Sequence, residues 1–280
     1  MEEKKMLKVT VDGKAYSYPY GTPYRAIAAD FQDQSPWDIL LVNREGKLCE
    51  LHKVLDRDCT LKMVTAREKP GIQTYERSAV FLMLKAFYDV AGRENVERLS
   101  VEYSLSSALF ILAKGSFTLD QDLLDRVEAR MRELSAAAVP IEKRSISTDD
   151  AVELFRQNRM PHKAHLLSFR INSHVNVYSL DGFVDYFYGY MAPDTSYVKC
   201  FGLELFENGF VLRLPTQADP NQLGEFRPSQ KVFRALYESS QRSQALNASN
   251  VAELNTTISQ GRATPLILAH EAMMEKKIGD

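Results

Sequence analysis

The chain has 280 residues, enough for about two domains, and its hydrophobic (45%) and charged (26%) fractions are those of an ordinary globular protein. A formal net charge of −2 argues against broad electrostatic binding to nucleic acid. No apolar run approaches the ~20 residues that span a bilayer, and no apolar signal core follows the charged start Met1-Glu2-Glu3. We therefore expect a cytoplasmic protein that does not contact a membrane.

The first 65 residues predict a small strand-rich domain. Residues 7–11 alternate between apolar and polar side chains, and Asp12-Gly13 is a hairpin turn signal before a return strand at 14–18. Thr22 can cap a helix that begins at Pro23. Further strands are predicted at 39–42, 47–49 and 60–64. Two strands, a helix and more strands are the order of a β-grasp, or ubiquitin-like, domain.

The region from about 72 to 225 is predicted to be α+β. Lys69-Pro70-Gly71 reads as a hinge, after which Thr74 can cap a long amphipathic helix. A capping box at Thr118 starts a helix that runs to about Ala137. The remaining elements are expected to be strands at 101–105, 108–112, near 141, 175–178, 183–186, 198–205 and 210–214, and short helices at 151–157 and 161–169.

After Pro228 the pattern becomes helical. Apolar residues at helical spacing predict two amphipathic helices, around Val232 and around Val251, and a third from Ala263 to Lys277. Because the pattern shows no stop signal before Asp280, we expect the chain to be a piece of a longer protein. The predicted domains are thus 1–66, 67–226 and a helical segment at 227–280.

Two short motifs carry the functional signal. The first is Arg77-Ser78-Ala79-Val80-Phe81 in the long helix, and the second is the run from Val184 to Thr195, with Phe187 and Met191 at its centre. They resemble the H-S-x-x-H and V-D-L-C-x-G-P-H-x-P-x-T motifs that form the editing site of threonyl-tRNA synthetases. Asp185, Gly189, Pro193 and Thr195 match the second motif. The resemblance implies a TGS domain at the start of the chain and an editing-like domain after it.

The residues that would carry editing chemistry are replaced. The four positions that the family uses for three histidines and a cysteine hold Arg77, Phe81, Phe187 and Met191, which we call the four motif positions. Phenyl and thioether groups cannot relay protons or bind a metal as imidazole and thiolate do. We therefore expect no catalytic residue and no metal site. His162 and His165 share a helix turn but have no third ligand nearby in the sequence.

Some polar residues of the editing site are kept. Lys163 matches the lysine of the family's Y-K-x-x-L-I pattern, and Asp185 matches the aspartate of the second motif. A candidate ligand pocket would combine these two with Arg77, Tyr75, Tyr188 and Tyr190, because aromatic rings can stack on a base while charged groups hold ribose or phosphate. The alternative, which we favour, is that the aromatic residues fill a core and that Lys163 and Asp185 form a structural ion pair.

A further resemblance covers essentially the whole chain. It is carried by the segments 101–105, 181–191, 210–215, 250–255 and 270–278. Together these resemble the front half of bacterial uridine kinase-like proteins, in which a TGS and editing-like region precedes a P-loop nucleoside kinase domain. The resemblance implies that ATP and Mg²⁺ belong to that kinase domain. This chain has no G-x-x-x-x-G-K-[ST] loop and is expected to bind neither.

Three functions are compatible with these patterns. The first is a non-catalytic regulatory region of a nucleoside kinase, whose partner is its own kinase domain and whose pocket senses a nucleotide or an RNA end. The second is a module that binds the acceptor end of tRNA without hydrolysing it. The third is a divergent aminoacyl-tRNA deacylase using Lys163 and Asp185. The sequence does not indicate an oligomeric state.

Overall fold

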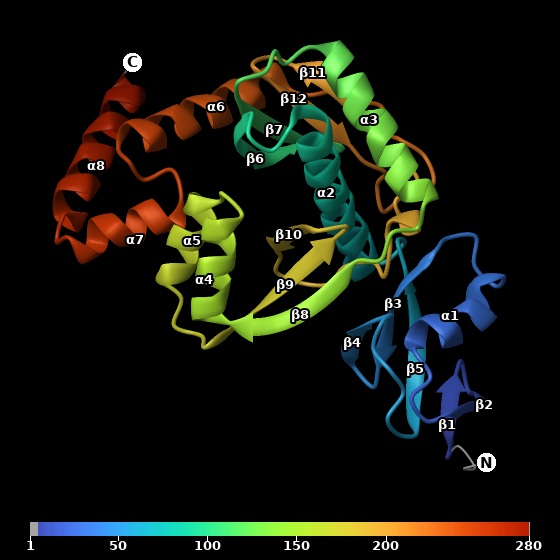
Figure 1. The fold of residues 1–280 in the computed structure, drawn as a ribbon. Coiled ribbons are helices and arrows are strands. Elements are labelled where there is room, and N and C mark those ends of the chain that lie inside the picture. Colours follow the sequence, from blue (N-terminus) through green and yellow to red (C-terminus); the bar gives the residue numbers. More distant parts are fainter. Residues whose placement is uncertain (1–4, 280) are drawn as a thin grey trace. The chain divides into compact units, whose positions relative to one another are not determined.

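The computed structural model describes residues 5–279, which form two compact units (Figure 1). One unit contains residues 5–143 and 178–227, and the other contains 144–177 and 228–279. The expectations for the charged start at Met1-Glu2-Glu3 and for the end at Asp280 lie outside the described residues. The division into three domains stays a prediction.

The first unit begins with a five-stranded β-grasp sheet, as the sequence predicts. The strand order is β2-β1-β5-β3-β4; β1 pairs with β5 in parallel, and the other pairs are antiparallel. Its elements are β1 (Met6–Val11), β2 (Lys14–Pro19), α1 (Tyr24–Gln32), β3 (Ile39–Arg44), β4 (Lys47–Glu50) and β5 (Cys59–Thr65). Helix α1 follows β2 and covers one face of this sheet (Figure 1).

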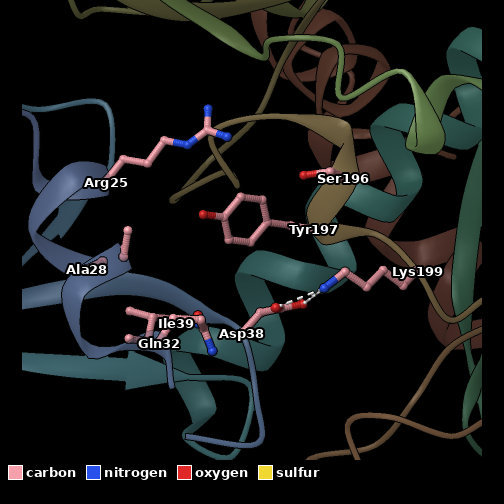
Figure 2. A pocket seen from close by; sticks show the side chains of 9 residues that line it. Arg25, Ala28, Gln32, Asp38, Ile39, Ser196, Tyr197 and Lys199 are labelled. Carbon is pink, nitrogen blue, oxygen red and sulfur yellow. Dashed lines mark hydrogen bonds and ion pairs between the residues drawn. The ribbon is translucent and has the colours of Figure 1, made fainter. Parts of the chain in front are cut away.

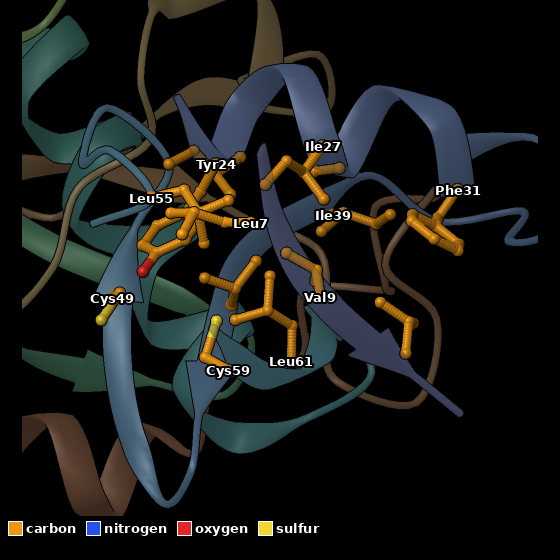
Figure 3. Packing of buried hydrophobic residues seen from close by; sticks show 14 residues of the cluster. Leu7, Val9, Tyr24, Ile27, Phe31, Ile39, Cys49, Leu55, Cys59 and Leu61 are labelled. Atoms are coloured by element: carbon orange, nitrogen blue, oxygen red, sulfur yellow. The ribbon is translucent and has the colours of Figure 1, made fainter. Parts of the chain in front are cut away.

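The alternating pattern of β1 sets the β-grasp core. Leu7, Val9 and Val11 are buried and face α1, whose Ile27 and Phe31 pack against the same cluster (Figure 3). Alternation of period two places every second side chain of a strand on one face. The predicted cap at Thr22 is wrong. No side chain caps α1, and the Thr22 hydroxyl instead donates to the Pro19 carbonyl at 2.7 Å, because the chain is still turning out of β2 there.

The rest of this unit packs two helices with a four-stranded antiparallel sheet in the order β11-β12-β7-β6. Its elements are α2 (Lys69–Ala91), β6 (Val96–Leu105), β7 (Ala108–Gly115), α3 (Gln121–Ala136), β10 (Phe183–Tyr186), the short 3₁₀ helix η1 (Thr195–Tyr197), β11 (Gly202–Phe206) and β12 (Gly209–Arg213). The ring of Phe87 on α2 stacks on Phe210 of β12, with ring centres 5.8 Å apart. The α+β class predicted from the sequence is confirmed.

The start of α2 corrects the predicted hinge. Residues 69–71 form the first turn of the helix rather than a linker, because proline is well tolerated in the first turn. Thr74 therefore lies inside the helix, where its buried hydroxyl donates to the Pro70 carbonyl at 2.8 Å. Gly71 is required there, since a Cβ would stand 1.9 Å from the Thr65 carbonyl oxygen.

The start of α3 also differs from the predicted capping box. Asp120, not Thr118, caps this helix by accepting a hydrogen bond from the Leu123 backbone N–H at 2.8 Å. Aspartate is as effective a cap as threonine, and the chain before it is extended.

The second unit is mainly helical. It contains α4 (Thr148–Gln157), α5 (Pro161–Ser168), α6 (Gln230–Ala245), α7 (Val251–Ser259) and α8 (Ala263–Gly279). Ser147 caps α4 by accepting from the Asp150 N–H at 3.0 Å, and the helices predicted after Pro228 are present. Strands β8 (Glu142–Ser147), β9 (His174–Leu180) and β10 form a three-stranded sheet in the order β10-β9-β8. The boundaries between the units at 143/144 and 177/178 fall within β8 and β9. No helix among residues 5–279 is both long and apolar enough to cross a membrane.

Candidate functional site

The structure brings the two motifs together within the first unit. Ser78 on α2 is fully buried, and its hydroxyl donates to the Thr74 carbonyl at 2.8 Å while accepting from the Ala192 backbone N–H at 2.9 Å. This side chain therefore ties α2 directly to the segment after Met191. Ser78 therefore has a structural role.

Two of the four motif positions form an aromatic contact. The ring of Phe81 on α2 packs edge-on against Phe187, with ring centres 5.3 Å apart and planes at 66°. Phe183 adds a tilted ring 5.7 Å from Phe81, and Tyr178 approaches Phe187 at 6.4 Å. Phe81 is fully buried, and Met191 is 1% exposed. Phe81 and Met191 are thus buried, and Phe81 packs against the ring of Phe187.

Arg77, at the remaining motif position, places its guanidinium between the Gln73 carbonyl and Gly189. Its Nη1 donates to the Gln73 carbonyl at 2.8 Å, and its Nε finds no acceptor among the described residues. Gly189 has a φ of +106°, and a Cβ there would stand 2.6 Å from Arg77 Nη2. Burial lowers the pKa of Arg77, whereas the nearby Glu76 and Glu50 raise it by a smaller amount. The positive φ favours a glycine at this position, because a residue with a Cβ is strained there.

A carboxylate from the β-grasp sheet reaches the same site. Glu50, the last residue of β4, is 1% exposed. Its Oε1 accepts from the Tyr178 hydroxyl at 2.9 Å and from the Met191 backbone N–H at 3.1 Å, and its Oε2 pairs with Lys143 Nζ at 2.7 Å. We refer to the three donors as the carboxylate site. Sequence reasoning missed it, because Glu50 lies more than a hundred residues from Tyr178 and Met191 along the chain.

Electrostatics around Glu50 follow from this burial. Desolvation and the neighbouring Glu50 raise the pKa of the Tyr178 phenol, which therefore stays protonated and can donate. His52 Nε2 lies 3.9 Å from Glu50 Oε2. Burial lowers the pKa of His52, and Lys143 lowers it further, against the attraction of Glu50. Because a lowered pKa favours the neutral imidazole, the cation that pairs directly with the Glu50 carboxylate is Lys143.

The other predicted pocket residues are dispersed. The Tyr75 hydroxyl accepts from the Cys200 N–H at 2.8 Å and lies 2.8 Å from the Cys200 carbonyl, so that this ring is anchored in the fold. Tyr188 is 71% exposed, and Tyr190 is half-buried. Asp185 is 2% exposed and accepts from the Tyr186 N–H at 2.7 Å. Lys163 lies on α5 in the second unit, so its pairing with Asp185 stays a prediction.

A separate pocket lies where α1 meets the segment around η1 (Figure 2). It has a volume of about 300 Å³ and is lined by Arg25, Ala28, Ala29, Gln32, Asp38, Ile39, Ser196, Tyr197 and Lys199. Arg25 pairs with the buried Asp194 at 2.7 Å, and Lys199 pairs with Asp38 at 2.7 Å. Because both cations are already neutralised, these pairs hold α1 and the loop before β3 to residues 194 and 199 rather than offering a charged ligand site.

Among residues 5–279, no group of three or more histidine, cysteine, aspartate or glutamate side chains is arranged to hold a metal ion. The site instead combines a buried acid, a lysine, an arginine and a tyrosine hydroxyl. The lysine, the tyrosine hydroxyl and the Met191 N–H are all engaged by the Glu50 carboxylate.

Comparison with known proteins shows a similarity to threonine–tRNA ligases. The chain is 27% identical over 195 residues to the enzyme of Thermotoga maritima, a match that covers 69% of this chain and 29% of the relative. The enzyme of Pelobacter propionicus is 29% identical over 159 residues (57% and 24%), and that of Halorhodospira halophila is 25% identical over 191 residues (68% and 29%). The match therefore spans less than a third of each relative. No family model matches the chain.

Proposed function

We propose that this region is a non-hydrolytic binding and regulatory module built on the framework of a threonyl-tRNA synthetase editing region. The packing of Phe81 against Phe187, beside the buried Met191, carries the proposal. Hydrolysis of an aminoacyl ester needs a positioned base or a metal-bound water. The four motif positions supply neither, which also disfavours the divergent deacylase.

We further propose that the module regulates a nucleoside kinase domain of the same cytoplasmic protein. The segments 250–255 and 270–278, which resemble those that precede the kinase of uridine kinase-like proteins, support this. ATP and Mg²⁺ would act in that kinase domain, on a pyrimidine nucleoside. The module would sense a nucleotide and pass its occupancy to the kinase.

A second candidate is binding of a tRNA acceptor end without hydrolysis. The similarity to threonine–tRNA ligases over about two thirds of the chain favours it. The net charge of −2 means that such binding would depend on a few local contacts rather than on a broad basic surface.

One set of measurements tests these proposals. The protein in excess over threonine tRNA charged with serine is expected to release no more serine than buffer does, and enzymatic release would overturn the non-hydrolytic assignment. Titration with uridine, cytidine, their nucleotides and uncharged tRNA then separates the two candidates. A nucleotide-specific signal supports the sensor, and tRNA binding that persists at 150 mM salt supports the second candidate.

The matched control for binding is a pair of arginine variants. Arg77→Ala removes the guanidinium beside Gly189 and is expected to weaken ligand binding. Arg57→Ala removes an arginine that is 64% exposed and pairs with exposed Glu45, and it should leave binding unchanged. Equal effects of the two substitutions would place the ligand elsewhere.

A further inference from the structure

The surroundings of Glu50 are those of a bound anion. Its carboxylate is 1% exposed and meets a lysine ammonium, a tyrosine hydroxyl and a backbone N–H, at 2.7, 2.9 and 3.1 Å. Burying a carboxylate costs several kcal/mol unless donors replace its water. Here Lys143, Tyr178 and Met191 replace that water on both oxygens.

The donors and the acid come from different parts of the unit. Glu50 is on β4 of the β-grasp sheet, whereas all three donors lie outside that sheet, on the segments that carry or adjoin the second motif. Arg77 adds a further positive charge near Glu50. The Glu50 carboxylate raises the pKa of Arg77, although burial, the larger effect, lowers it. The side chain of Glu50 thus enters the site as an external ligand would.

The Tyr178 hydroxyl shows how strongly the site favours an anion. Its oxygen lies 2.9 Å from Glu50 Oε1 and 3.0 Å from the Gly189 carbonyl, but it has a single proton to donate. A hydrogen bond to a charged acceptor is stronger than one to a neutral carbonyl. The proton therefore serves the carboxylate.

We infer that Lys143, Tyr178 and the Met191 N–H form an anion-binding site for a carboxylate or phosphate group, and that Glu50 occupies it as an internal ligand. This inference rests on the proposed binding role of the region and names the ligand class of the same site. An external anion of this class would take the place of the Glu50 carboxylate on the same three donors.

The test removes the internal ligand and supplies an external one. In Glu50→Ala, sodium acetate or inorganic phosphate, titrated at constant ionic strength against sodium chloride, is expected to raise the melting temperature saturably by about 3 °C or more. The wild-type protein is expected to shift by less than 1 °C, because Glu50 already fills the site. Saturation by acetate alone identifies a carboxylate site, and saturation by phosphate identifies a phosphate site.

Two variants control the experiment. Glu45→Ala removes an exposed acid in the turn between β3 and β4 and is expected to respond to anions as the wild type does. Adding Lys143→Met to Glu50→Ala is expected to abolish the response to acetate and phosphate. The inference is overturned if Glu50→Ala responds no more than the wild type, or if its response survives loss of Lys143.

Even if Glu50→Ala fails to fold, the binding of an external anion by the three donors can be tested. If this variant is unfolded in chloride, acetate or phosphate must restore its near-ultraviolet circular dichroism, and failure of both anions overturns the inference. The proposed function is tested separately, on the wild-type protein with charged tRNA and nucleotides. A failure of one proposal is therefore distinguishable from a failure of the other.

Discussion

The guanidinium of Arg77 lies against the backbone of Gly189, so closely that a Cβ at residue 189 would stand 2.6 Å from Nη2. Gly189 has a φ of +106°, a backbone conformation that strains any residue with a Cβ. The Arg77 guanidinium ends a flexible side chain and can shift, so the positive φ is the main reason why this position favours glycine.

We predict that Gly189→Ala destabilises the protein by about 1–2 kcal/mol, mainly because a side chain is strained at a φ near +106°, with a smaller steric part because the flexible Arg77 side chain can shift. Gly182→Ala is the matched control, since Gly182 also has a positive φ but has nothing within 4 Å of its Cβ position. Urea unfolding measures both. Adding Arg77→Ala to Gly189→Ala should recover the steric part, and no recovery would contradict the assigned contact.

The contact between Phe81 and Phe187 predicts a coupled loss of stability. Phe81→Ala should lower the free energy of unfolding by about 3–5 kcal/mol, since it empties a fully buried site. In a double-mutant cycle with Phe187→Ala, the coupling should be about 0.5–1.5 kcal/mol. Tyr188→Ala, at a 71% exposed residue, is expected to cost less than either. Strict additivity would show that the two rings do not interact.

His52 reports on the charges around Glu50. Its pKa is lowered by burial, so the folded state favours the neutral ring. Unfolded His52 binds a proton below about pH 6.5 while the folded residue does not, and its contribution to stability is therefore present above that pH and lost as the pH falls. By NMR titration, Lys143→Met should raise the pKa of His52, and Glu50→Gln should lower it. Shifts in the opposite directions would contradict the arrangement.

The pair of Arg25 and Asp194 should be asymmetric. Asp194 is 1% exposed, and its carboxylate also accepts from the Ser196 N–H at 2.9 Å, whereas Arg25 is 53% exposed. Asp194→Ala is expected to cost about 2–4 kcal/mol, because it removes a capping acceptor as well as the ion pair. Arg25→Ala should cost less, since the N–H and the hydroxyl of Ser196 still donate to the remaining acid. Thermal unfolding of both variants, with the exposed Arg57→Ala as control, measures this difference.

Local pattern predicted most of the elements and missed some of their ends. Alternation in β1 and the Asp12-Gly13 turn indicated the first hairpin, and helical spacing indicated α2 and α6 to α8. The start of α2 was misplaced because Pro70 and Gly71 favour a linker as isolated residues. Their place in a first turn depends on the close approach of Thr65, which is not visible in the sequence.

The sequence by itself determined the β-grasp order, the α+β class and the absence of histidine and cysteine at the four motif positions. These follow from periodicity and residue type, which are local properties. Only the tertiary structure decided that Glu50 enters the site, that Tyr75 is anchored to Cys200, and that Lys163 and Asp185 belong to different units. Such contacts join residues far apart along the chain, and their formation depends on how buried surfaces and donors are matched in the folded protein.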